Sequence, residues 1–134
     1  PRARDLMKAT PMLAPVRDQI DGIAYYRWRT FESPKGTITV SRTGYTGELG
    51  FEINVPARHG LALWEKLMAA GQQYDICPYG TETMHVLRAE KGYIVIGDET
   101  DGTVTPVDVG LDGLVSKKKS DFIGKRSLLV PSHA

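Results

Sequence analysis

The hydrophobic pattern changes its period at Pro56, and this change constrains the fold more than any other feature of the chain. Before Pro56, aromatic and β-branched residues alternate with polar ones over residues 23–31 and 37–42, and residues 51–55 resume the same period of two. After Pro56, residues 57–73 carry apolar side chains at a helical spacing, namely Leu61, Trp64, Leu67 and Met68. The pattern therefore predicts a β-hairpin, a third strand and then an amphipathic helix.

The rest of the chain adds two further helices and a region of turns. A short helix is predicted over residues 2–9, followed by a loop over residues 10–22, because the residue before a proline avoids helical geometry. A helix is predicted over residues 81–90, followed by a short apolar strand over residues 93–96. Residues 97–116 alternate turn residues with short β segments. Adjacent strands mixed with helices indicate an α+β fold rather than a regular βαβ series.

Composition and charge exclude several classes of protein. The chain has 134 residues, the size of one ordinary domain, and 17 basic against 16 acidic residues give a net charge of +1. This balance provides no overall field for nucleic acid or an anionic membrane. The single cysteine, Cys77, cannot form an internal disulfide, no apolar run reaches the ~20 residues that span a bilayer, and no signal peptide is visible. These features predict a reducing, cytoplasmic compartment.

Residues 41–53, SRTGYTGELGFEI, pose the main functional question. Their three glycines, spaced by three, do not match a dinucleotide-binding or P-loop pattern, and a tight connection between strands explains them without a ligand. A plain turn, however, does not need Arg42, Tyr45, Glu48 and Glu52 together. An aromatic ring and a carboxylate suit a planar, amino-substituted heterocycle. From the residues alone, a solvated Glu52 on the polar face of its strand remains the default reading.

Other candidate sites have simpler explanations. Glu82 and His85 have the spacing of a di-iron helix, but a second such pair is not visible, so we predict no metal site. Cys77 precedes a proline and has no histidine nearby, which argues against a nucleophile. The acidic residues 97–102 miss the register of a calcium loop and indicate a hairpin turn. The basic run within residues 117–126 is interpreted as a solvated loop rather than a contact for a polyanion or a partner subunit.

Three stretches, in order, resemble the folate-binding aminomethyltransferase family, which includes the T-protein of the glycine cleavage system. They are SRTGYTGELGFEI at 41–53, LRAEKG at 87–92 with TVTP at 103–106, and KKSDFIGKRSL at 118–128. The resemblance covers nearly the whole chain. The particular form that these family motifs take in this chain resembles the α subunit of heterotetrameric sarcosine oxidase.

The resemblance implies a tetrahydrofolate site in which Glu52 holds the pterin and Tyr45 lines the cavity. The glycine-cleavage enzyme uses an arginine where this chain has Met84, which argues against that subfamily. The essential aspartate of the family is expected upstream of Pro1, because Pro1 to Met7 resembles a segment that follows it. We therefore expect a fragment of a longer polypeptide, with no catalytic residue of its own and inactive alone.

The resemblance also sets expectations for architecture and activity. It implies an antiparallel sheet with two packed helices over residues 1–96, within the folate-binding domain, and the start of a C-terminal β-barrel domain over residues 97–134. The parent enzyme is expected to capture the one-carbon unit of sarcosine as 5,10-methylenetetrahydrofolate. Flavin and NAD are expected in other parts of that enzyme, and the other sarcosine oxidase subunits are the expected partners. A dimethylglycine dehydrogenase or glycine-cleavage relative and a non-catalytic folate-binding module are the alternatives.

Overall fold

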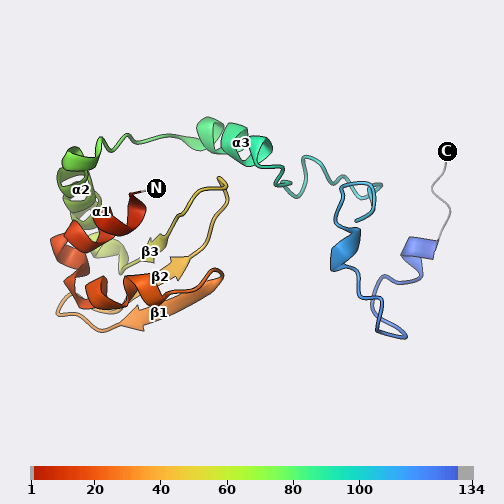
Figure 1. Cartoon of the computed structure of the whole chain (residues 1–134), viewed down its shortest axis with the longest axis horizontal. Helices are drawn as coiled ribbons and strands as arrows, with labels where there is room; N and C mark the ends of the chain where they lie inside the picture. Colours follow the sequence, from red (N-terminus) through yellow and green to blue (C-terminus); the bar gives the residue numbers. More distant parts are fainter. Residues whose placement is uncertain (1, 130–134) are drawn as a thin grey trace. The chain divides into compact units, whose positions relative to one another are not determined.

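The computed structural model describes residues 2–129, and the chain divides into two units, with the boundary in the sequence between Lys91 and Gly92. The first unit holds the sheet and the longer helices, and the second is built of turns and short 3-10 segments (Figure 1). Each unit is described by itself below. In the described residues, none of the helices combines the length and the apolar character that a membrane crossing requires.

The sheet of the first unit has three antiparallel strands in the order β1-β2-β3. They are β1 (Arg27–Phe31), β2 (Ile38–Arg42) and β3 (Glu52–Asn54). The predicted hairpin and third strand are thereby confirmed, although β1 begins later than the predicted residue 23. The cause of the late start is Tyr26, whose φ of 57° is left-handed and interrupts an extended strand.

Helical segments flank the sheet in sequence. α1 (Ala3–Ala9) and α3 (Thr81–Glu90) match the predicted helices, and Gly92 follows α3 with a φ of 79°, as expected at a helix end. The predicted helix over residues 57–73 is α2 (Gly60–Gly71), extended by the 3-10 turns η2 (Ala57–His59) and η3 (Gln72–Tyr74).

The predicted loop over residues 10–22 is wrong, because this segment forms the 3-10 helix η1 (Pro11–Gly22). A proline at the first helical position costs no hydrogen bond, so Pro11 starts the segment rather than preventing it. The signal in the sequence was the spacing of four apolar residues that the structure buries: Met12, Leu13, Val16 and Ile20.

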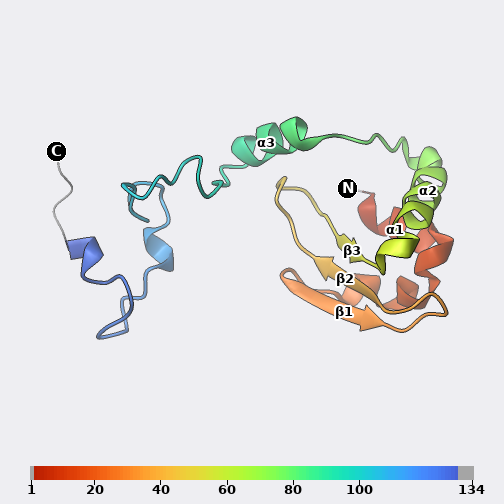
Figure 2. The ribbon, with the colours of Figure 1, turned by 180° about the vertical axis from the view of Figure 1, so that it is seen from behind.

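The hydrophobic core of the first unit lies on one face of the sheet. α1, η1 and α2 pack against one another there, and the 3-10 helix η1 can be followed from both sides (Figures 1 and 2). The buried apolar residues are Met7, Met12, Leu13, Val16, Ile20, Ile23, Phe31, Ile38, Val40 and Leu63. Thr10 is also fully buried, and its hydroxyl donates to the Leu6 carbonyl at 2.8 Å, which satisfies the polar group inside the core. The opposite face of the sheet carries mainly polar and exposed residues.

The second unit differs from its prediction. The structure contains no strand within residues 92–129, so the strand at 93–96 and the β segments at 97–116 are wrong. A single isolated bridge joins Ile96 and Thr100, and the short helices are η4 (Asp112–Leu114) and η5 (Ser127–Leu129). An apolar run becomes a stable strand only when a neighbouring strand pairs with it. The C-terminal barrel stays a prediction.

The acidic segment 97–102 forms turns rather than the predicted hairpin. The Gly97 amide donates to Thr100 Oγ1 at 3.1 Å. The Thr103 hydroxyl donates to Asp101 Oδ1 at 2.7 Å, and this bond holds the pKa of the Asp101 carboxyl below its ordinary value. The side chains of Thr100 and Asp101 thus accept hydrogen bonds from within the same turns.

Candidate functional site

The connection between β2 and β3, residues 43–51, folds back tightly on itself. A Cβ added to Gly44 would lie 3.3 Å from the carbonyl oxygen of Glu48, and one added to Gly50 would lie 3.2 Å from that of Thr43. Side chains at either position would press against the backbone. The close approach expected of these glycines is therefore confirmed, and it brings both ends of the connection to the end of the sheet.

Gly47 meets the other requirement expected of this motif, a left-handed backbone, with a φ of 82°. The aliphatic stem of Lys91 also occupies the space beside it, since a Cβ on Gly47 would lie 2.6 Å from both Cγ and Cδ of Lys91. Lys91 directly follows α3, so this contact joins the connection to the end of that helix within the first unit.

Glu52 is the first residue of β3 and its side chain is exposed. It lies opposite Ser41 of β2 in the antiparallel register. The Thr43 hydroxyl donates to Glu52 Oε1 at 2.7 Å, a short bond to a charged acceptor. This bond holds the carboxylate in one orientation, and a carboxylate has acceptor sites to spare for an additional donor.

Tyr45 lies within the connection and is 39% exposed, so part of its ring is accessible. A second tyrosine borders the same loop. A Cβ added to Gly44 would lie 3.6 Å from the ring of Tyr25, and the Tyr25 ring lies 4.2 Å from that of Tyr26, between centroids. Tyr25 therefore places a second aromatic ring beside the loop that carries Tyr45.

Arg42 and Glu48, which the sequence placed beside the two site residues, have other roles. Successive side chains of a strand point to opposite faces, so Arg42 does not share the face of Ser41 and Glu52. Its guanidinium donates to the Ile23 carbonyl at 3.3 Å. Glu48 is exposed at the tip of the connection.

Thr43 is the residue that sequence reasoning missed in this region. It stands directly before the glycine motif, and its register with Glu52 depends on how β2 and β3 pair. A hydroxyl next to a turn usually signals a backbone contact, so the sequence offered no reason to connect it to a carboxylate nine residues away.

α3 carries the positions that bear on the subfamily. Met84, at the place where the glycine-cleavage enzyme is expected to carry arginine, is half-buried. Arg88 of the Leu-Arg-Ala-Glu motif is buried, at 8% exposure. Glu82 is exposed on the same helix, and the described part of the chain contains no cluster of three or more residues able to hold a metal ion.

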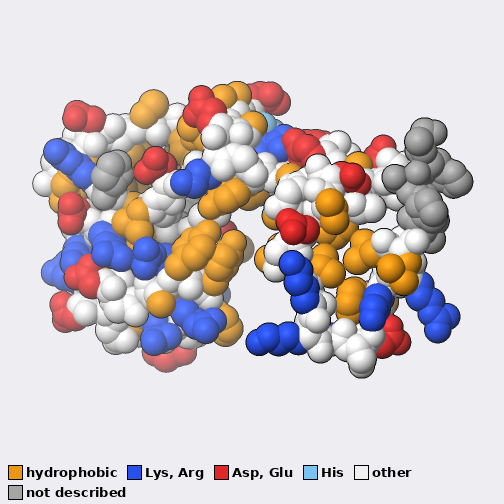
Figure 3. All heavy atoms as spheres, turned by 45° about the vertical axis from the view of Figure 1, so that its right-hand side comes forward, with side chains coloured by type: hydrophobic (Ala, Val, Ile, Leu, Met, Phe, Trp, Pro, Cys, Tyr) orange, Lys and Arg blue, Asp and Glu red, His pale blue; other side chains and the backbone are white. Residues whose placement is uncertain are grey.

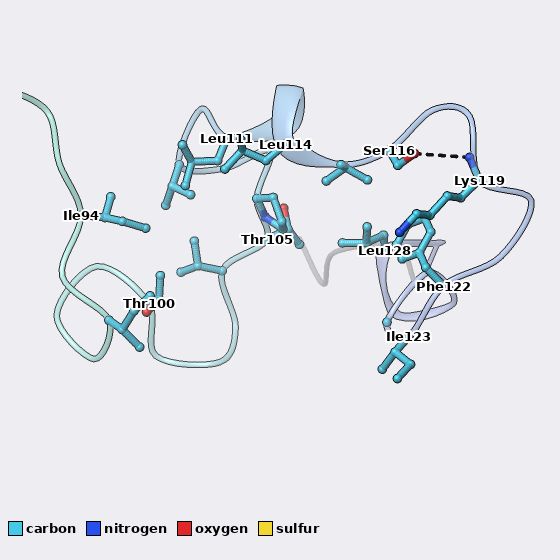
Figure 4. A pocket seen from close by; sticks show the side chains of 16 residues that line it. Ile94, Thr100, Thr105, Leu111, Leu114, Ser116, Lys119, Phe122, Ile123 and Leu128 are labelled. Atoms are coloured by element: carbon cyan, nitrogen blue, oxygen red, sulfur yellow. Dashed lines mark hydrogen bonds between the residues drawn. The ribbon is translucent and has the colours of Figure 1, made fainter. Parts of the chain in front are cut away.

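A mainly apolar hollow lies within the second unit, away from the predicted site residues. Its volume is about 570 Å³, and its lining, between Ile94 and Leu128, is mainly apolar. Figure 4 shows the Lys119 side chain reaching toward this hollow, while the Lys119 amide donates to Ser116 Oγ at 3.3 Å. In the space-filling view, hydrophobic and basic side chains lie next to one another on this unit (Figure 3). With Lys119 as its one titratable lining residue, the hollow offers no acid–base pair.

In chemical terms, the connection and β3 provide a fixed carboxylate and accessible aromatic rings. Such a set can accept N–H donors from a flat ring and stack against it. It does not provide a nucleophile next to a base. The geometry suits binding and orientation of a ligand.

Comparison with known proteins identifies similar chains. The family model described as the GCVT N-terminal domain matches residues 1–119. Sarcosine oxidase subunit alpha from Corynebacterium sp. strain U-96 is 64% identical over 88 residues, and that from strain P-1 is 61% identical over the same length. These matches cover 66% of this chain and 9% of each subunit. An aminomethyltransferase from Halothermothrix orenii is 37% identical over 110 residues, which is 82% of this chain and 31% of that protein. The chain thus spans about a third or less of these relatives.

Proposed function

Because the chain belongs to the GCVT N-terminal domain family, we propose that it binds tetrahydrofolate, with Glu52 as the acceptor for the N–H groups of the pterin and Tyr45 as an aromatic wall. The observation that carries the proposal is the Thr43–Glu52 hydrogen bond, because it fixes an exposed carboxylate beside a loop rich in aromatic surface. The side chain of an exposed strand residue that has no hydrogen-bond partner in the protein is normally solvated and free to change rotamer. A fixed carboxylate is pre-organised for a ligand.

We further propose that the chain is part of an enzyme similar to sarcosine oxidase subunit alpha, whose name the more identical relatives carry. In that enzyme, tetrahydrofolate would accept the one-carbon unit released from sarcosine and leave as 5,10-methylenetetrahydrofolate. Glu52 and Tyr45 would orient the ring and exclude water on their side of the site, which is a contribution of positioning rather than proton transfer. The aspartate expected for catalysis, the flavin and the NAD would belong to other parts, and the chain alone would be inactive.

Calorimetric titration of the chain with folinic acid, a stable reduced folate, tests the binding. We expect Glu52→Ala to weaken binding at least about tenfold, since hydrogen bonds to a charged group contribute roughly 1.5–3 kcal/mol and 1.4 kcal/mol is a factor of ten. Asn54→Ala is the matched control, because Asn54 is an exposed residue on the same strand and face. Wild-type protein that does not bind, or equal affinity in Glu52→Ala and wild type, would refute the assignment.

A further inference from the structure

The register of the sheet aligns Trp28, Ser41 and Glu52 in one row across the three strands. Trp28 of β1 lies opposite Ser41 of β2, and Ser41 lies opposite Glu52 of β3. Directly opposite residues of antiparallel strands project from the same face of a sheet. The three side chains therefore share a face, although 24 positions separate the first from the last in the sequence.

This face is the open one. The neighbouring row confirms the geometry, because the hydroxyls of Thr30 and Thr39 lie 3.3 Å apart on the same side. The residues that alternate with them, Ile38 and Val40, are buried in the core on the opposite side. The row that contains Glu52 consequently faces away from the core.

Trp28 is 61% exposed, which leaves a large apolar ring without the burial that normally stabilises it. Ser41, between Trp28 and Glu52, is small and half-buried, so no bulky side chain fills the middle of the row. Neighbouring strands lie about 4.8 Å apart, which places the backbones of Trp28 and Glu52 roughly 10 Å from each other. The row thus has an indole at one end, a carboxylate at the other and a low floor between them.

We propose that Trp28 is a second aromatic contact of the Glu52 site, against which the flat ring of the bound pterin lies while its N–H edge meets the carboxylate. Ser41 forms the floor beneath the ring. The Thr43 hydroxyl donates to Glu52 Oε1 and holds the carboxylate in place at its end of the row. This inference rests on the proposed function, and it assigns a binding residue outside the glycine motif.

The two tryptophans of the chain provide the test, because Trp64 lies on α2, outside the row, and is 54% exposed. Folinic acid is titrated into the full chain, with affinity from calorimetry and quenching from tryptophan fluorescence. We expect Trp28→Ala to raise Kd roughly two- to tenfold, the value of one aromatic pair, and Trp64→Ala to leave it unchanged. Folinic acid should quench the tryptophan fluorescence of Trp64→Phe, in which Trp28 remains. It should leave the fluorescence of Trp28→Phe unchanged.

The outcomes distinguish a failure of this inference from a failure of the proposed folate binding on which it rests. Wild-type protein that does not bind folinic acid contradicts both. Binding that Glu52→Ala weakens and Trp28→Ala leaves unchanged contradicts only the role of Trp28, as does quenching carried by Trp64. Circular dichroism of each variant verifies the fold, and Trp28 is exposed enough for its replacement to leave the core intact.

Discussion

Replacement of Thr43 by valine tests whether the hydroxyl holds Glu52 in its binding orientation. Valine keeps the branched shape of threonine and removes only the group that donates to Glu52 Oε1 at 2.7 Å. A bond to a charged acceptor is strong, but Glu52 is exposed, so water replaces part of what is lost. We therefore expect a loss of about 0.5–1.5 kcal/mol in binding, which corresponds to a Kd roughly two- to tenfold higher.

The assay is calorimetric titration of folinic acid into wild type, Thr43→Val and Thr43→Ser. Serine retains the hydroxyl and should restore most of the affinity. Thr30→Val is the matched control, because its hydroxyl contacts Thr39 in the neighbouring row and not the carboxylate. Equal affinity in wild type and Thr43→Val, or a loss in serine as large as that in valine, would show that the bond does not orient Glu52.

Two further predictions concern stability. Gly71→Ala should lower the free energy of unfolding by about 1–2 kcal/mol in a urea titration, because the added Cβ would lie 2.6 Å from Cβ of Ile76. Gly60 lies in the same helix with open space around it, so Gly60→Ala should be neutral or stabilising by about 0.5 kcal/mol. Equal effects of the two substitutions would argue against close packing of Gly71 on Ile76. The Lys8 ammonium bonds to Asp21 at 2.5 Å and lowers the pKa of that carboxyl from its ordinary 3.8, so the bond stabilises the fold above about pH 4 and is lost as the pH falls through the lowered value. Wild type should therefore exceed Asp21→Asn in urea midpoint at about pH 6 and equal it at about pH 2, and a difference that persists in acid would contradict this origin.

Local pattern was sufficient for most elements of the first unit. Helices and strands leave periodic signatures in a short window, so α2, α3 and the alternation of Phe51, Ile53 and Val55 could be predicted. It was insufficient for η1, where a proline that reads as a helix stop instead opens the segment. It also failed at residues 93–96, because the formation of a strand depends on a partner elsewhere in the chain.

The features of the candidate site also differ in whether they depend on local sequence or on long-range strand pairing. The sequence by itself determined that a tight, glycine-rich connection leads into β3 and that Glu52 lies on the polar face of this strand, because both features follow from neighbouring residues. Only the tertiary structure decided what lies beside Glu52. Strand register is a non-local property, and it alone brought Thr43 to the carboxylate and set Trp28 and Ser41 in its row.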